Sequence, residues 1–288
     1  MCLNPGDILC DRYRIIAELG RGCAITYTAE DLESPGNRLC VVKEIRHPQS
    51  TDPLVLQQAK QEFQREVEAL RLLGQDSRIP EYYNSFQDPE NGNFYLVQEY
   101  IEGHPLSQEI TNGTQWTEEE TVALLREIME ILQFVHQKNV IHRDIKPSNL
   151  IRRQSDGKIV LIDFGAVKEI SSLEITESGK TRTRTIYTPG YTSPEQMHGC
   201  PKFCSDIYST GIIGIQAVTG LCPASDLLTH SQGDIVWRYS IRNQPIVEIS
   251  HQLEIVLNNM VSYYFPNRYQ SAADVLEALR SVTALPPP

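Results

Sequence analysis

Residues 140–150 set a carboxylate, an amine and an amide at fixed offsets between apolar residues. Asp144 is followed two residues later by Lys146 and five residues later by Asn149. A carboxylate can accept the proton of a hydroxyl group, an ammonium group can neutralise charge on a phosphoryl group in transit, and an amide oxygen can bind Mg²⁺. These side chains at this spacing therefore indicate transfer of a phosphoryl group to a hydroxyl group.

A further carboxylate, Asp163, follows the apolar run 159–162. A carboxylate at the end of a buried strand costs several kcal/mol unless it is paired, so a metal ion is the simplest partner. We therefore predict Asp163 as a second metal ligand beside Asn149.

Two kinds of secondary structure must position these residues. The first third of the chain alternates with a period of two and predicts an antiparallel sheet of five strands at 13–19, 24–30, 38–45, 82–86 and 94–100. Residues 54–73 within it predict one amphipathic helix. After residue 102 the apolar period becomes 3.6, so we expect a second, mainly helical part and an α+β fold.

The expected second part begins with a capping box at Thr117 and a long helix that ends near Asn139, directly before residues 140–150. Residues 150–152 and 159–162 predict a short hairpin. A buried helix is expected from Ser205 to Val218, because Gly220 is a typical terminator, and residues 237–280 are expected to be helical.

Several motifs, taken in order, resemble those of protein kinases. His-Arg-Asp-Ile-Lys-Pro-Ser-Asn at 142–149 resembles the catalytic loop, Asp-Phe-Gly at 163–165 the metal-binding triplet, and Ser-Pro-Glu at 193–195 the end of the activation segment. The style of the motifs is similar to bacterial Hanks-type serine/threonine kinases. The resemblance implies a two-lobed kinase fold, with an ATP-binding lobe at 1–102, a catalytic lobe at 103–283 and a Pro-rich tail at 284–288.

The resemblance also implies roles for individual residues. The catalytic group would consist of Asp144, Lys146 and Thr188. Residues 188–191 resemble the substrate-positioning turn, in which Thr188 would form hydrogen bonds with Asp144 and Lys146. The residues implied to bind the nucleotide and its metal are Gly20, Gly22, Lys43, Glu66, Glu99, Ile101, Asn149 and Asp163. Among these, Lys43 and Glu66 would form an ion pair, Glu99 and Ile101 would bind adenine through their backbone, and Asn149 and Asp163 would hold the metal. Asp206 would cap the catalytic loop, although it is equally suited to cap its own helix, and Arg268 would pair with Glu195.

The implied activity is transfer of the γ-phosphoryl group of ATP, with Mg²⁺ or alternatively Mn²⁺, to Ser or Thr residues of protein substrates. Lys146 and Thr188 favour Ser or Thr acceptors over Tyr. Arg143 precedes Asp144, so a phosphate on Thr183 or Thr185 could pair with it and order the loop. The alternative is that Arg182 and Arg184 pair with nearby carboxylates and hold the loop without modification. A transient homodimer would suit autophosphorylation.

The glycine-rich turn departs from the kinase pattern, since it is one residue short and Ala24 stands where a third glycine is expected. A pseudokinase scaffold with impaired use of ATP is therefore the alternative, and a small-molecule kinase is a more distant one. Cys23 at the tip is either an inert small residue or a thiol whose alkylation would impair ATP use.

Composition argues against several other classes of protein, namely nucleic-acid-binding, membrane-spanning and disulfide-rich proteins. The formal charge of −11 disfavours non-specific binding to nucleic acid, and no apolar run approaches the roughly 18 residues that span a bilayer. Without a signal-peptide pattern, a cytoplasmic protein is expected. Seven scattered Cys residues indicate reduced thiols, and Cys200 with Cys204 lacks a second ligand pair for zinc.

Overall fold

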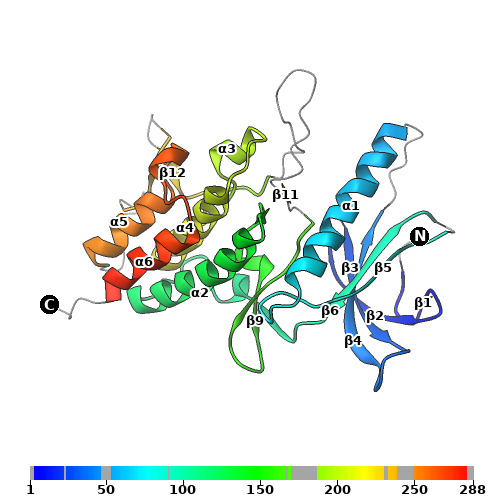
Figure 1. Cartoon of the computed structure of the whole chain (residues 1–288). Helices are drawn as coiled ribbons and strands as arrows, with labels where there is room; N and C mark the ends of the chain where they lie inside the picture. The colour runs from blue at the N-terminus through cyan, green and yellow to red at the C-terminus, as the bar shows by residue number, and fades with distance from the viewer. Residues whose placement is uncertain are drawn as a thin grey trace. The chain divides into compact units, whose positions relative to one another are not determined.

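A computed structural model of the chain describes residues 3–22, 24–46, 53–89, 91–165, 168–169, 187–229, 233–238 and 249–283. It divides into two compact units, Met1–Glu102 and Gly103–Pro288, called here the N-terminal and C-terminal units. Cys23, Thr183, Thr185 and the Pro-rich tail lie outside the described residues. The predicted α+β class is confirmed, with strands gathered in the first unit and helices in the second (Figure 1).

The N-terminal unit is built on a six-stranded antiparallel sheet with the strand order β1-β2-β3-β4-β6-β5. The strands are β1 (Ile8–Leu9), β2 (Tyr13–Arg21), β3 (Ile25–Asp31), β4 (Arg38–Ile45), β5 (Tyr82–Gln87) and β6 (Phe94–Glu99). All five predicted strands are present with their ends within two residues. The sequence did not predict β1, because two residues are too short to show a period.

The two faces of this sheet pack against different parts of the unit. One face holds a core cluster that includes Tyr13, Tyr27 and Val42. The other face packs against α1 (Pro53–Leu73), where Phe63 stacks on Phe94 of β6 with ring centroids 4.8 Å apart. Side chains alternate along a strand, so the residue after Val42 must lie on the face of α1.

The C-terminal unit is mainly helical. Its helices are α2 (Glu118–Gln137), α3 (Pro194–Met197), α4 (Phe203–Thr219), α5 (His251–Met260) and α6 (Ala272–Thr283), with short 3-10 turns at Leu106–Gln108, Pro147–Asn149 and Phe265–Asn267. Helices α4 and α6 both pack against α2, and α5 packs against both of them (Figure 1). Residues 204–219 of α4 are all buried, so this helix forms the centre of the unit.

The helix signals in the sequence correspond to real caps. Thr117 and Glu120 form the predicted capping box at the start of α2, and α4 ends at Gly220, which has a φ of 66°. Helix α4 begins at Phe203, two residues before the predicted start at Ser205. Ser205 lies in the first turn of the helix, where its Oγ accepts the backbone N–H of Lys202.

Short strands complete the C-terminal unit. Strand β9 (Leu150–Arg153) pairs with both β10 (Ile159–Leu161) and β7 (Gly103–Pro105), which confirms the hairpin and adds a strand that was not predicted. Two-residue pairs join β8 (Val140–Ile141) to β11 (Lys168–Glu169) and β12 (Leu228–Thr229) to β13 (Ile235–Val236).

Two expectations about this unit were wrong. Strand β10 ends at Leu161, so Asp163 lies two residues beyond it rather than at its end. Trp237 follows β13, and the described helices of the last part begin only at His251. Across the described residues, no helix combines the length and the apolar character needed to cross a membrane.

Candidate active site

In the N-terminal unit, Lys43 and Glu66 form an ion pair. Lys43 is paired in register with Leu96 of β6, so it lies on the sheet face that packs against α1. Its Nζ lies 2.6 Å from Oε1 of Glu66 on α1, and the two side chains are only 15% and 6% exposed. The implied pair is therefore present, and it places a fixed ammonium group on this face of the sheet.

Gly20 lies near the end of β2, and Gly22 lies in the turn between β2 and β3. Gly22 donates its backbone N–H to the carbonyl of Ala24 over 2.9 Å, which closes the turn. A Cβ atom built on either glycine would meet no atom within 4 Å, and neither glycine has a positive φ. The described part of the chain thus gives no steric reason for glycine at these positions, whereas close approach of a ligand to the backbone would require it.

Ile101 follows the last strand of the N-terminal unit. Among the described residues, its N–H and C=O make no hydrogen bond with another backbone group, whereas the N–H of Glu99 donates to Glu81 over 2.9 Å. Ile101 therefore offers a donor and an acceptor of the kind that a purine edge requires.

In the C-terminal unit, three side chains converge on the Asp144 carboxylate. Thr188 Oγ1 donates to Oδ1 over 2.6 Å, while Lys146 Nζ and Asn149 Nδ2 donate to Oδ2 over 2.7 and 3.0 Å. Asn149 Nδ2 also reaches the Asp144 backbone carbonyl at 2.8 Å. The carboxylate is therefore fixed in orientation by three donors from three positions of the chain.

One detail of this cluster differs from expectation. Thr188 was expected to bond both Asp144 and Lys146, but its hydroxyl contacts only Asp144 among the described residues. Lys146 instead donates to the other oxygen of the same carboxylate. Thr188 is itself held by Thr192, whose Oγ1 accepts the Thr188 N–H at 2.7 Å.

The backbone of the loop that contains Asp144 is capped from α4. Asp206 is fully buried, and its carboxylate accepts the N–H groups of His142 and Arg143 over 2.9 and 2.8 Å. His136 of α2 donates to the same carboxylate over 2.9 Å. Burial alone would raise the pKa of Asp206, but the hydrogen bond with His136 and the other donors hold it below its ordinary value.

Asp206 therefore caps the loop and not its own helix, whose N-cap is Lys202. This resolves the two alternatives left open by the sequence. The cap matters because Arg143 has a φ of 67°, which strains a residue with a side chain. Its N–H is held by Asp206 and its C=O accepts a bond of 2.7 Å from Gln196 Nε2. The residue before Asp144 is thus fixed on both sides.

His142 connects the loop to the segment that contains Asp163. Its Nδ1 accepts the Asp144 N–H at 3.3 Å, so Nε2 carries the proton and donates to the carbonyl of Ile162 at 3.2 Å. Its ring meets the edge of Phe164 with centroids 5.0 Å apart. Burial lowers the pKa of His142 below its ordinary value despite three nearby carboxylates, which fits the neutral tautomer.

Asp163 also has strained backbone, with a φ of 67°. Its Oδ1 accepts the Gly165 N–H at 3.3 Å, and the residue is half-buried. In hydrogen bonds to described residues the Asn149 side chain uses only its Nδ2, so its Oδ1 is available to a cation. A carboxylate and an amide oxygen form the hard donor set that Mg²⁺ or Mn²⁺ prefers.

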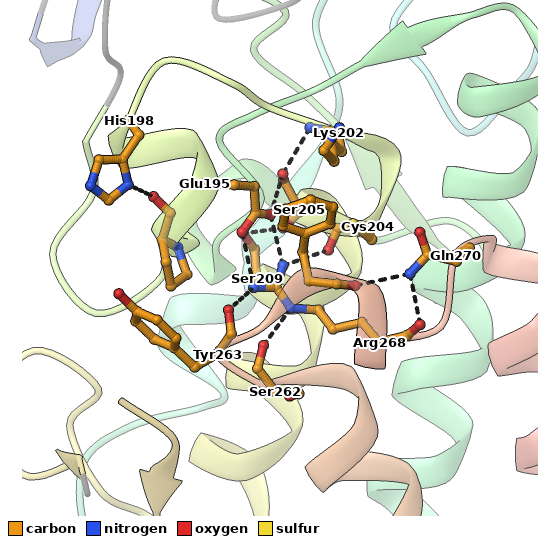
Figure 2. Close-up of polar contacts among 12 residues, drawn as sticks. Glu195, His198, Lys202, Cys204, Ser205, Ser209, Ser262, Tyr263, Arg268 and Gln270 are labelled. Atoms are coloured by element: carbon orange, nitrogen blue, oxygen red, sulfur yellow. Dashed lines mark hydrogen bonds and ion pairs between the residues drawn. The ribbon is translucent and has the colours of Figure 1, made fainter. Parts of the chain in front are cut away.

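Glu195 and Arg268 form the predicted pair, shown in Figure 2. Arg268 donates from Nη1 and Nη2 to the two oxygens of Glu195 over 2.7 and 2.9 Å. The same guanidinium reaches the carbonyls of Ser262, Tyr263 and Cys204, so a single buried side chain ties together three segments. Burial would raise the pKa of Glu195, but the Arg268 bonds more than offset it and the pKa is lowered.

Glycine is required at the turn that follows Thr188. Tyr191 donates its N–H to the Thr188 carbonyl over 3.1 Å, so residues 188–191 form the predicted turn. Gly190 has a φ of 82°, and a Cβ there would lie 2.6 Å from the Pro223 backbone. The turn that presents Thr188 is therefore packed closely against residues after α4.

Several residues of this network were not predicted. His136, His142, Gln196 and Thr192 orient the loop or Thr188, but their contacts were not predicted from the sequence. The spacing of a capping box or a helix face shows only near neighbours, whereas His136 and Gln196 act on residues far away in the sequence.

The protein kinase domain family matches residues 13–279. Serine/threonine-protein kinase PknA of Nostoc sp. is 40% identical over 286 residues, covering 98% of this chain and 49% of that protein. Serine/threonine-protein kinase B of Synechocystis sp. is 39% identical over 277 residues, covering 94% and 47%. The chain thus spans about half the length of these curated relatives.

Solved structures agree on the fold. The kinase domain of Mycobacterium tuberculosis PknI is 19% identical in sequence and superposes with a TM-score of 0.70, covering 98% of this chain and all of that domain. At this level of identity the likeness shows the two-lobed fold alone.

Proposed function

The chain belongs to the protein kinase domain family, and from this premise we propose that it transfers the γ-phosphoryl group of ATP to Ser or Thr hydroxyl groups of proteins. The observation that carries the proposal is the Asp144 carboxylate, oriented by Thr188, Lys146 and Asn149. Such a carboxylate can take the proton of an incoming hydroxyl group.

Each residue around Asp144 has a distinct part in this proposal. The Thr188 hydroxyl lies 2.6 Å from Oδ1, a distance at which a proton can be transferred, which supports the approach of a substrate hydroxyl to this carboxylate. Lys146, held at Oδ2, supplies positive charge next to the group in transit. The double cap on Arg143 keeps the loop from rotating Asp144 out of place.

The nucleotide and a divalent cation fit the residues present. The open backbone at Gly20 and Gly22 suits the phosphates, the Lys43 ammonium group is fixed by Glu66, and Ile101 suits the adenine edge. Asn149 and Asp163 would hold the cation, with Mg²⁺ preferred and Mn²⁺ accepted by the same oxygens. When bound, the cation neutralises charge on the phosphate oxygens.

The choice of Ser and Thr over Tyr rests on Lys146 and Thr188 and on the names of the relatives, which are serine/threonine kinases. The alternative of a pseudokinase scaffold finds no support among them. Its motivation was the shortened glycine turn, but both described glycines leave their backbone open.

We extend the proposal to regulation. Thr183 and Thr185 are the proposed sites of autophosphorylation, and a transient homodimer would bring one copy to another. Mass spectrometry after incubation with Mg²⁺ and ATP tests this directly. If the variant Thr183→Ala with Thr185→Ala keeps full activity on an added substrate, phosphorylation there is not the switch.

The activity itself is tested by incubating the protein with labelled ATP, Mg²⁺ and a generic protein acceptor, followed by acid hydrolysis. Label in phosphoserine and phosphothreonine is expected. Label in phosphotyrosine alone, or on a small-molecule acceptor alone, would overturn the proposed substrate class.

A further inference from the structure

Lys43, whose ammonium group is proposed to bind the phosphates, lies close to the end of β4 in the N-terminal unit. Only Glu44 and Ile45 follow it in the strand. Its partners in register are Thr26 of β3 and Leu96 of β6. The ends of secondary-structure elements open more readily than their middles. The position of Lys43 therefore depends on the contacts that hold this end of β4.

The ion pair with Glu66 holds the ammonium end of Lys43 at 2.6 Å, but it does not fix the strand. Lysine carries its charge on a long, flexible stem, which can keep such a contact while the backbone moves. The charge is placed only if the backbone of β4 is held as well. The next residue supplies contacts of that kind.

Glu44 lies on the face of the sheet opposite to Lys43, because side chains alternate along a strand. The residue is 0% exposed. Its Oε2 accepts the phenol hydroxyl of Tyr27 over 3.0 Å, and its Oε1 accepts Nδ2 of Asn93 over 2.7 Å. Within the described part of the chain it forms no ion pair, so this buried carboxylate is held by neutral donors.

A carboxylate is an unusual side chain for this position. Val42 and Tyr95 on the same face belong to the core cluster, and burying a charge among them is costly unless donors offset it. An apolar side chain would avoid this cost, but apolar contacts have no preferred direction. Hydrogen bonds do have one. Glu44 therefore gives the end of β4 a fixed orientation that an apolar residue would not give.

The two hydrogen bonds of Glu44 connect β4 to both of its neighbours. Tyr27 belongs to β3, the strand that follows the glycine turn, and Asn93 directly precedes β6. Asn93 is itself held in its turn, where its N–H donates to Asn91 Oδ1 over 2.8 Å. The contacts act one residue beyond Lys43, at the point where the strand would otherwise open first.

We propose that Glu44 is a positioning residue for nucleotide binding, which holds the end of β4 so that Lys43 on the other face keeps its ammonium group at the phosphates. The inference rests on the proposed kinase activity and adds a residue to it. Glu44 and Lys43 are adjacent, so a twist or opening of the strand end moves both side chains. A group misplaced by about 1 Å can cost about 100-fold in rate.

Glu44→Leu tests this role, because it keeps the approximate size and removes both acceptor oxygens. It should lower kcat/KM for ATP by about 10- to 100-fold, the cost of a misplaced group, while KM for the protein acceptor stays unchanged. Glu44→Gln keeps an acceptor oxygen and should stay within a few-fold of wild type. If Glu44→Gln and Glu44→Leu are equally impaired, or if Glu44→Leu keeps the kcat/KM of wild type, the inference is wrong.

Tyr27→Phe provides a second variant if Glu44→Leu does not fold. It removes one donor to the carboxylate and keeps the ring in the core, so kcat/KM for ATP should fall by about 3- to 10-fold. An unchanged kcat/KM for ATP in a folded Tyr27→Phe protein would then overturn the inference.

The background Lys43→Met separates positioning from stability. If Glu44 acts by placing Lys43, adding Glu44→Leu to Lys43→Met should change kcat/KM for ATP by less than about 2-fold, since no ammonium group is left to place. Melting temperatures, measured alongside, report the contribution of Glu44 to the fold. An equal decrease in kcat/KM with and without Lys43 would mean that Glu44 only stabilises the unit.

The matched control is Glu68→Leu, which makes the same change at an exposed residue of α1 in the same unit. It should leave the kinetic parameters for ATP unchanged. Equal effects of Glu44→Leu and Glu68→Leu would overturn the inference.

Failure of the kinase activity itself is recognised separately. Displacement of a fluorescent ATP analogue by Mg²⁺-ATP gives Kd without turnover. A wild type that binds ATP but transfers no phosphoryl group contradicts the proposed function alone. Glu44→Leu should then still raise the Kd by about 3- to 10-fold, the size of one lost polar contact, and an unchanged Kd would overturn the positioning role. A wild type that binds no ATP overturns both.

Discussion

Thr188 Oγ1 donates a hydrogen bond of 2.6 Å to Asp144 Oδ1, although 44 residues separate them in the sequence. The carboxylate that we propose as the proton acceptor is therefore oriented by the segment that ends at the Ser193-Pro194-Glu195 motif. Asp144 keeps this hydrogen bond only while the segment that carries Thr188 is in place. The orientation of Asp144 and the position of that segment are therefore coupled.

Removing the Thr188 hydroxyl should lower activity without unfolding the protein. Thr188→Val keeps the shape and loses a hydrogen bond to a charged group, which corresponds to a decrease in kcat of about 10- to 100-fold. Thr188→Ser keeps the donor and should stay within a few-fold of wild type. Steady-state kinetics on a protein substrate measures both, and equal activity of the Val and Ser variants would contradict the role of this contact.

Lys43→Met should lower kcat/KM by about 100-fold or more, because it removes a fixed positive charge proposed to contact the phosphates. It also leaves Glu66 as a buried carboxylate without its lysine, so some stability should be lost. The double variant Lys43→Met with Glu66→Gln separates the two effects. Its melting temperature should recover while its activity stays low; recovery of activity would mean that Lys43 is only structural.

The Glu195–Arg268 pair should contribute strongly to stability. Arg268→Ala leaves the buried Glu195 carboxylate without its cation and removes a donor from several carbonyls, and we expect a loss of about 3–5 kcal/mol in the free energy of unfolding. Arg280→Ala, in an ion pair whose side chains are both 74% exposed, is the control and should cost no more than about 0.5 kcal/mol. Denaturant unfolding measures both variants. If they lose similar amounts of unfolding free energy, burial of the Glu195–Arg268 pair does not increase its contribution to stability.

Stability should fall as the pH decreases below about 6.5, the ordinary pKa of histidine. Burial keeps His142 neutral in the folded state, whereas the unfolded chain binds the proton, so protonation favours unfolding. The slope from this group is at most about 1.4 kcal/mol per pH unit. Asp206 and Glu195 have lowered pKa values, so their stabilisation is lost only in more acidic solution, at and below their unfolded pKa values near 4.

Melting temperatures between pH 7.5 and pH 5 would measure this dependence. His142→Gln should flatten the pH profile while lowering stability at neutral pH. His251→Gln, at a side chain that is 78% exposed, should leave the profile of the wild type unchanged. If His142→Gln leaves the pH profile unchanged, the proton that is taken up on unfolding binds to another group.

The sequence predicted local structure well because its signals are local. The capping box at Thr117, the terminator Gly220 and the strand that carries Lys43 each depend on neighbouring residues. The resemblance to kinases added pairs such as Glu195 with Arg268, which no spacing argument could supply. His136, which bonds Asp206 across 70 residues, was missed because its partner is determined by how α2 packs on α4.

The two-residue strand β1 and the strained φ values at Arg143 and Asp163 were missed for a related reason. A strained backbone is maintained by surrounding contacts, in this case by Asp206 and Gln196 for Arg143, and not by the preference of the residue itself.

The role of Asp144 is tested by comparing the variants Asp144→Asn and Asp156→Asn. Both variants replace one carboxylate by an amide, but Asp156 lies in the exposed turn between β9 and β10, where it pairs with Arg153. With labelled ATP, Mg²⁺ and a protein acceptor, wild type and Asp156→Asn should transfer label at similar rates. Asp144→Asn should be slower by a factor of about 10²–10⁴, the usual contribution of a general base. Equal rates for the two variants, or no label on protein from any of the three, would contradict the proposal that Asp144 drives phosphoryl transfer.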